Sequence, residues 1–276
     1  MRKKRFEAVM QLLTWGAAII TFGILIFILG FILVKGIPFI KPSLFAFTYN
    51  SDNVSLMPAL ISTIQMTFLS LFIAVPLGIF AAIYLTEYAK RDDKAVKLVS
   101  ITTETLSGIP SIVYGLFGML FFVNYLSWGF SLLAGAFTLS IMILPLIMRS
   151  SEEALKAVPD TYREGSFGLG AGKLRTVFTI ILPSAMPGIL AGIILAIGRI
   201  VGETAALIYT AGTVAQVPTN PMMSARTLSV HMYALSSEGI HTNEGYATAV
   251  VLLIVVVLIN MLSSKVVNKI RIGGTK

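Results

Sequence analysis

The residues best suited to chemistry in this sequence are two charges inside an apolar stretch. Residues 180–211 are apolar enough to cross a bilayer, yet they include Arg199 and Glu203. A charged side chain at the centre of a bilayer costs about 2.5–3.5 kcal/mol on insertion scales. Charges kept at that cost indicate either a function or a pairing within the protein. An arginine in such a place offers a permanent positive charge and a planar fork of donors for the oxygens of an anion.

The spacing of these two charges predicts the direction in which they point. Positions four apart share one face of an α-helix. The small residues of the stretch fall with both charges within an arc of about 100°: Gly188, Gly192, Gly202 and Ala206. A face of small residues lets another helix approach closely, so we expect both charges to point into protein. Glu203 would then neutralise Arg199 between anions. Alternatively, the two residues form a structural ion pair that locks two helices together.

Four further side chains are candidates for contact with an anion. Ser107, Ser111 and Tyr114 begin another apolar stretch, where their hydroxyl groups can donate to a cargo. Residues of these types also cap or pack helices, and that alternative stays open. Arg226 lies in a long connection between two apolar stretches. It is interpreted either as an attractor of anions at an entrance or as an ordinary surface arginine.

The composition indicates the environment of the chain. Of 276 residues, 56% are hydrophobic and only 12% are charged, and the mean hydropathy is +0.86. Soluble domains carry about 25% charged residues. These values exclude a soluble enzyme, a disordered chain and a nucleic-acid-binding domain, despite a net charge of +8. The chain has no cysteine, and therefore no disulfide or thiolate metal site. The sequence indicates a membrane protein.

The apolar residues group into stretches that match the thickness of a bilayer. A spanning helix needs about 20 apolar residues. Six stretches qualify or nearly qualify, which predicts an all-α protein with six transmembrane helices: 9–34, 57–86, 106–126, 130–148, 180–211 and 246–262. The first is too long for a cleavable signal peptide, whose apolar core has about 7–15 residues, so we interpret it as a retained span.

The positive charges between the spans predict their orientation. Lysine and arginine gather in cytoplasmic loops. Seventeen lie at the two ends of the chain and in the second-to-third and fourth-to-fifth connections, against three in the other connections. This asymmetry places both termini in the cytoplasm and accounts for the basic net charge as a topology signal.

The connection at 149–179 carries a second kind of signal. It is predicted to hold two short helices separated by Pro159, because Ser150–Glu153 and Thr161–Glu164 both fit a capping box. Several large apolar residues of the second piece would face water unless something covers them: Phe167, Leu169, Leu174, Val177 and Phe178. A docking element is favoured over a solvated hairpin.

A motif in this connection resembles a known family. Permeases of ATP-binding-cassette (ABC) importers carry a cytoplasmic signature of Glu-Ala-Ala, Gly, Ile and Leu-Pro at fixed spacing. This chain has the matching residues, with two small residues replacing the alanines: Glu164, Gly165, Ser166, Gly170, Ile180, Leu182 and Pro183. The resemblance implies that these residues couple the chain to an ATPase subunit. Gly170 is expected to permit the sharp turn that ends the coupling helix.

Further stretches resemble one subfamily of these permeases. Residues 198–205 (GRIVGETA) resemble the Arg-x-x-Gly-Glu-Thr stretch of phosphate importer permeases, and residues 107–115 (SGIPSIVYG) look like the same subfamily. The segment 226–233 (RTLSVHMY) is similar to the PstA type of subunit. The resemblance implies the type I importer permease fold (MetI-like) and a phosphate path through Arg199.

The same resemblance implies a set of partners. These are a dimer of ABC ATPase subunits (PstB type) that binds ATP with Mg²⁺, a second permease (PstC type), and an extracytoplasmic phosphate-binding protein (PstS type). This chain itself is expected to be no enzyme, to hold no cofactor, and to reside in the cell membrane of a prokaryote. We expect residues 57–267 to form the permease domain, preceded by 1–56 with the first span and followed by a cytoplasmic tail, 268–276.

Other ligand patterns are weaker. The glycine-rich residues 168–173 lack the Walker A requirements of glycine at 167 and serine or threonine at 174. His231, Glu238, His241 and Glu244 share one connection but form no compact ligand set, so no metal site is expected.

The alternatives left open are a permease for molybdate or sulfate and, more remotely, a secondary transporter or a membrane enzyme that acts on lipid.

Overall fold

The structure, a computed structural model, describes residues 2–90 and 94–273, and every regular element within them is a helix. The predicted all-α class is therefore confirmed. Arg91, which belongs to the charge count above, and residues 274–276 of the predicted tail lie outside the described residues. Five helices are long and apolar enough to cross a membrane, or six spans if one bent pair counts as one. The five contain α1 (Arg2–Gly36), α2 (Met57–Ile83), α5 (Leu132–Lys156), α8 (Leu182–Gly202) and α11 (Thr242–Gly273).

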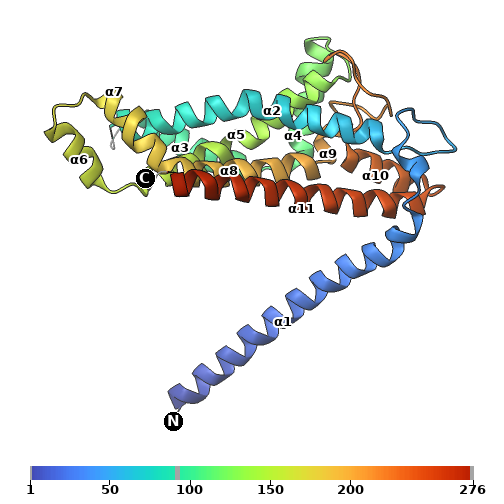
Figure 1. Cartoon of the computed structure of the whole chain (residues 1–276), viewed down its shortest axis with the longest axis horizontal. Coiled ribbons are helices and arrows are strands. Elements are labelled where there is room, and N and C mark those ends of the chain that lie inside the picture. Colours follow the sequence, from blue (N-terminus) through green and yellow to red (C-terminus); the bar gives the residue numbers. More distant parts are fainter. Residues whose placement is uncertain (1, 91–93, 274–276) are drawn as a thin grey trace.

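The bundle has two ends, which we name after the short helices found there. The α6 end carries α6 (Asp160–Gly168) and α7 (Lys173–Thr176), and the α10 end carries α10 (Leu228–Glu238) and the loop before α2. The start of α1 and the end of α11 both lie toward the α6 end (Figure 1). An even number of crossings produces this arrangement. Helix α1 leaves the bundle at an angle, and none of its spanning window is buried.

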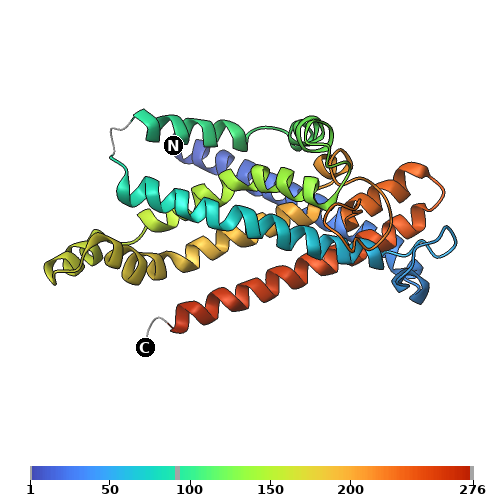
Figure 2. The same cartoon turned by 90° about the horizontal axis from the view of Figure 1, so that it is seen from above.

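The third predicted span, 106–126, covers only one part of a bent pair of helices. Its residues form α4 (Ser111–Gly118) and η4 (Met119–Tyr125, a π-helix), whereas the predicted connection before it holds a further helix, α3 (Lys94–Ser107), and the two parts meet at 102°. In Figure 2, α3 (teal) runs along the bundle, whereas α4 (green) is seen almost end-on. Pro110 explains the bend, because it lacks an N–H and keeps the residue before it out of the helical conformation. The hydroxyl of Tyr114 donates to the carbonyl of Leu106 at 2.7 Å across the bend.

The fifth predicted span begins earlier and ends earlier than the sequence indicates. It starts at α7, passes through η5 (Val177–Ile181, a π-helix) into α8, and ends at Gly202. Glu203 is extended, with ψ of 129°, and a separate short helix, α9 (Ala205–Ile208), follows. The prediction of one helix over 180–211 is therefore wrong at the α10 end.

The core of the bundle lies around α5, which packs between α2 and α8. Small residues of α8 permit the close approach that their spacing predicts. A Cβ on Gly188 would lie 2.7 Å from the Cβ of Ala154, and a Cβ on Gly192 would collide with Ser150. Gly78 of α2 meets Ile147 of α5 in the same way. Glycines thus set the spacing between the three central helices.

Both predicted capping boxes at the α6 end are wrong. Helix α5 runs without a break through residues 150–153, and the hydroxyl of Ser150 donates back to the carbonyl of Leu146. Leu155, one turn further, is buried in the core, so packing favours continuation of the helix. The second helix, α6, begins after Pro159 with no side-chain cap. The break predicted at Pro159 is confirmed.

Candidate functional site

Arg199 lies in the last turn of α8, half-buried, and has no carboxylate partner. Within the described residues, no ion pair or hydrogen bond involves its guanidinium group. A positive charge in the last turn of a helix is favourable, because the helix dipole is negative there. The charge is therefore tolerated in α8 and is available for an anion.

Glu203 takes a different place from the one that its spacing predicts. Because α8 ends at Gly202, Glu203 does not share a helix face with Arg199, and no ion pair joins them within 4.0 Å. Its side chain is buried (8% exposed), and one carboxylate oxygen accepts from the backbone N–H of Ala206 at 3.1 Å. The hydroxyl of Ser229 donates to its backbone carbonyl at 2.6 Å. Glu203 thus caps α9.

The two stretches that resemble phosphate permeases meet in space. Helix α4 packs on α9, and a Cβ on Gly115 would lie 2.7 Å from the Cα of Ala206. Tyr114 is buried beside this contact and lies within electrostatic range of Arg199. Its hydroxyl donates to the carbonyl of Leu106. Ser111 is half-buried at the start of α4. Ser107 is exposed and donates to the carbonyl of Glu104 at 2.7 Å, so it caps α3.

Arg226 is buried (6% exposed) and is therefore no surface arginine. Its guanidinium carbon lies 5.7 Å from the ring centroid of Tyr49, and its Nη1 donates to Nδ1 of His231 at 3.4 Å. Nε of Arg226 and Nε2 of His231 have no hydrogen-bond partner among the described residues. The expectation that Arg226 stands open at an entrance is wrong in this conformation. It belongs instead to a buried polar cluster at the α10 end.

This cluster predicts a pH dependence of stability. Burial, and then the positive charge of Arg226, lower the pKa of His231 to about 4. The unfolded chain binds the proton near pH 6.5, so stability is complete above that value and falls as the pH drops toward 4, by about 3 kcal/mol. We expect the melting temperature of the purified protein to fall in this range. His231→Gln, which keeps an acceptor for Arg226, should remove most of that fall, and an unchanged pH profile in the variant would refute this assignment.

The docking segment, which we define as residues 160–180, is built around a tight turn. After α6, Gly170 adopts φ of +80°, its N–H donates to the carbonyl of Phe167, and the N–H of Ala171 donates to the carbonyl of Ser166. These paired bonds form a Schellman motif, which needs a left-handed residue at the position of Gly170. The turn predicted at Gly170 is confirmed.

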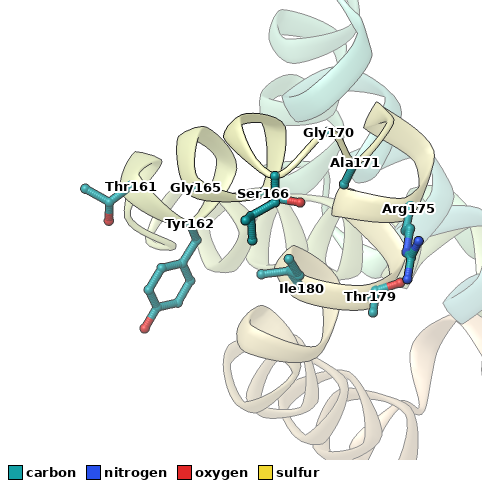
Figure 3. A pocket seen from close by; sticks show the side chains of 10 residues that line it. Thr161, Tyr162, Gly165, Ser166, Gly170, Ala171, Arg175, Thr179 and Ile180 are labelled. Carbon is teal, nitrogen blue, oxygen red and sulfur yellow. The ribbon is translucent and has the colours of Figure 1, made fainter.

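The docking segment presents an apolar surface at the α6 end. Leu169 is 91% exposed, and Phe167, Leu174 and Phe178 are exposed as well. Val177, predicted to face water with them, is buried instead in the core next to α2. A groove of about 630 Å³ lies between α6 and the chain from Ala171 to Ile180 (Figure 3). An exposed apolar surface of this kind marks an interaction site.

The signature residues divide into two groups in the structure. Glu164, Gly165 and Gly170 are exposed on the docking segment. Ser166 is buried, and its hydroxyl lies 2.8 Å from that of Thr176, so it ties α6 to α7. The other three stand where the segment joins the bundle: Ile180 at the groove, and Leu182 and Pro183 in the first turn of α8.

Apolar spans, a charged helix end within them and an exposed docking segment define a multi-pass membrane transport subunit that works with another protein. The chain belongs to the family described as "Binding-protein-dependent transport system inner membrane component", which matches residues 74–270. It is an ABC importer permease subunit of a prokaryotic membrane.

Curated relatives include phosphate permeases. The chain is 34% identical over 211 residues to "Phosphate transport system permease protein PstA 1" of Mycobacterium tuberculosis (strain CDC 1551 / Oshkosh), covering 75% of this chain and 69% of that protein. It is 34% identical over 243 residues to "Probable ABC transporter permease protein YqgI" of Bacillus subtilis (strain 168), covering 81% and 80%.

Solved structures show the same fold. The MetNI methionine ABC transporter, in an inward-facing conformation, matches with a TM-score of 0.61 and 21% identity, over 78% of this chain and 94% of that chain. A bacterial alginate ABC transporter, in complex with a periplasmic protein that binds an alginate pentasaccharide, matches with a TM-score of 0.61 and 19% identity, over 92% and 95%. The predicted MetI-like fold is confirmed.

Family membership defines what the subunit does. It is a non-enzymatic transport subunit, and the ATPase activity lies in a partner. The family also implies a further permease subunit and a substrate-binding protein. The secondary transporter and the lipid enzyme that the sequence left open are set aside.

Proposed function

We propose that this chain is the PstA-type permease subunit of an ATP-driven importer of inorganic phosphate. The observation that carries the proposal is Arg199, an unpaired arginine at the end of an intramembrane helix. A guanidinium group holds the oxygens of a phosphate through two parallel hydrogen bonds. The PstA-named relatives support phosphate over other anions.

The partners follow from the same proposal. A PstB-type ATPase dimer binds ATP with Mg²⁺ and receives the docking segment, a PstC-type permease completes the path, and a PstS-type protein delivers phosphate from outside. Both termini and the α6 end then face the cytoplasm of a prokaryotic cell, in keeping with the excess of lysine and arginine in those connections. The α10 end faces the binding protein, and the spans contact membrane lipid.

Coupling in this scheme is mechanical. Closure of the ATPase dimer on ATP moves the docking segment, whose chain continues through α7 and η5 into α8 without interruption. Displacement of α8 switches access to Arg199 between the two sides of the membrane. Glu203 caps α9 and so fixes the chain just beyond this moving end. Tyr114, which lies within electrostatic range of Arg199, and Ser111 both belong to α4, which packs on α9. We place both residues on the phosphate path.

Uptake with competing anions tests the choice of cargo. Vesicles that contain the complete complex should accumulate labelled phosphate in the presence of ATP. Excess unlabelled phosphate should suppress this uptake, whereas molybdate or sulfate at equal concentration should leave most of it. Accumulation of labelled molybdate or sulfate, with no accumulation of labelled phosphate, would identify the other oxyanion as cargo and overturn the proposal.

A further inference from the structure

Arg163 of the docking segment, which belongs neither to the signature nor to the phosphate path, forms a buried ion pair with the end of α2. Arg163 of α6 directs its guanidinium group at Glu87, with Nη2 at 2.7 Å and Nε at 3.2 Å from the same carboxylate oxygen. The side chains of Arg163 and Glu87 are only 16% and 7% exposed. The contact joins residues 76 positions apart in sequence.

The same guanidinium group also closes the end of α5. Its Nη1 donates to the carbonyl of Val158 at 2.9 Å, and its Nη2 donates to the carbonyl of Leu155 at 3.1 Å. The last carbonyls of a helix lack partners within the helix, and an arginine satisfies them well. Asp160 adds an exposed contact at 3.1 Å. Arg163 thus connects three segments: α6, the end of α5 and the end of α2.

Glu87 places this contact at the end of a central helix. It lies in η3 (Tyr84–Tyr88), a π-helical turn that continues α2. Such turns are frequently found at functional sites. At the opposite end of α2, the hydroxyl of Thr63 accepts from the backbone N–H of Leu228, at the start of α10. Helix α2 therefore reaches from the docking segment to the buried polar cluster at the α10 end.

Helix α6 is bounded by a break in the helix at each end, so a side-chain contact gives it a further connection to the bundle. Pro159 breaks the helix before α6, and the turn at Gly170 ends it. Ser166 ties α6 to α7 and so to α8, but it makes no contact with α2. Helix α7 also reaches the end of α2, where Nζ of Lys173 lies 5.0 Å from the ring centroid of Tyr88. Arg163 adds a charged connection from α6 itself to α2.

We propose that the Arg163–Glu87 pair is a second coupling link, which makes α2 move with the docking segment while the chain itself carries the motion to α8. This inference rests on the proposed function, in that the segment receives an ATPase. Arg163 and Glu87 are positioning residues and touch no cargo. A charge-assisted pair in a shielded place is strong enough for this purpose, whereas an exposed pair contributes little.

The test is the number of anions transported per ATP hydrolysed by the complete complex. Arg163→Gln and Glu87→Gln should each lower this ratio about tenfold, the scale of a typical coupling free energy. The ATPase should still co-purify, because the exposed docking surface is unchanged. Glu87→Gln is the milder change, since glutamine has the same shape, and it keeps the test valid if Arg163→Gln reduces yield.

Two double variants separate coupling from simple stabilisation. If the pair only stabilises the fold, Arg163→Gln with Glu87→Gln should recover the wild-type ratio, because no buried charge is left unpaired. If the pair couples the docking segment to α2, the ratio of the double neutral variant stays low. The ratio of the exchanged variant, Arg163→Glu with Glu87→Arg, is then higher than that of the double neutral variant. A wild-type ratio in the single variants or in the double neutral variant overturns the proposal.

A matched control and a choice of anion complete the design. Arg149 and Glu153 form an exposed pair at 3.3 Å on the same end of α5, with side chains 58% and 70% exposed, and Arg149→Gln with Glu153→Gln should change nothing. The ratio is measured with whichever oxyanion the wild-type complex transports. Failure of phosphate as cargo is therefore seen in the wild type, and failure of the coupling link is seen in the variants.

Discussion

Replacing Gly170 by valine should detach the ATPase from this subunit. The position has φ of +80° within the Schellman motif that ends α6, a conformation that a β-branched residue adopts only with strain. Nothing lies within 4 Å of a Cβ built there, so the strain is purely in the backbone, about 1–3 kcal/mol. If the turn rearranges, the docking surface changes shape, and we expect binding of the ATPase to weaken about tenfold or more. Co-purification from membranes measures it.

The matched control for this change is Gly170→Asn. Asparagine tolerates the left-handed conformation far better than valine does, so the ATPase should co-purify nearly as well as with the wild type. Insertion of both variants into the membrane should be normal, since the turn lies outside the spans. Full recovery of the ATPase and unchanged transport with Gly170→Val would show that residues 160–180 do not dock it.

Hydropathy alone located the spans, because it depends only on how many apolar residues follow one another. It could not locate the breaks. The bend at 108–110 has a visible cause in Pro110, but the end of α8 at Gly202 has none in composition, since apolar residues continue to Ala211. That break is set by tertiary contacts: the hydroxyl of Ser229 donates to the carbonyl of Glu203, and α9 packs on α4. The ion pair inferred from i, i+4 spacing failed for this reason.

The docking segment was recognisable because its motif is local. Four parts of the signature between Glu164 and Pro183 lie at fixed spacing in the sequence. A glycine in such a motif also predicts the positive φ that Gly170 adopts. The Arg163–Glu87 pair was missed, because nothing in a single sequence connects residues 76 positions apart. The burial of Arg226 was missed similarly, since Tyr49, which stacks on it, comes from a distant loop. Arginine in a connection is usually exposed.

Replacing Arg199 by glutamine should abolish phosphate uptake. The change removes the positive charge and the bidentate fork while keeping a polar side chain of similar length. Loss of a desolvated, charge-assisted contact costs about 3 kcal/mol, which corresponds to roughly a hundredfold in rate or affinity. Arg199→Lys keeps the charge but loses the fork, so partial uptake by this variant would indicate that charge matters more than geometry. Uptake is measured in cells at matched expression.

Glu203→Gln is the natural companion to this change. In the structure, Glu203 is not paired with Arg199, and a glutamine can still accept from the N–H of Ala206. We therefore expect this variant to fold and insert normally. If Glu203 approaches Arg199 when no anion is bound, its loss should slow the release of phosphate more than its entry.

The measurement that tests the central claim most directly is phosphate uptake by the double variant Arg199→Gln with Glu203→Gln, at wild-type expression and in the complete complex. If Arg199 contacts the passing anion, the second change cannot replace the lost donor. Uptake then stays at the background level of Arg199→Gln alone. Recovery to near wild-type rates would contradict the claim, because only an uncompensated charge would have been repaired. Arg199 would then lie outside the phosphate path.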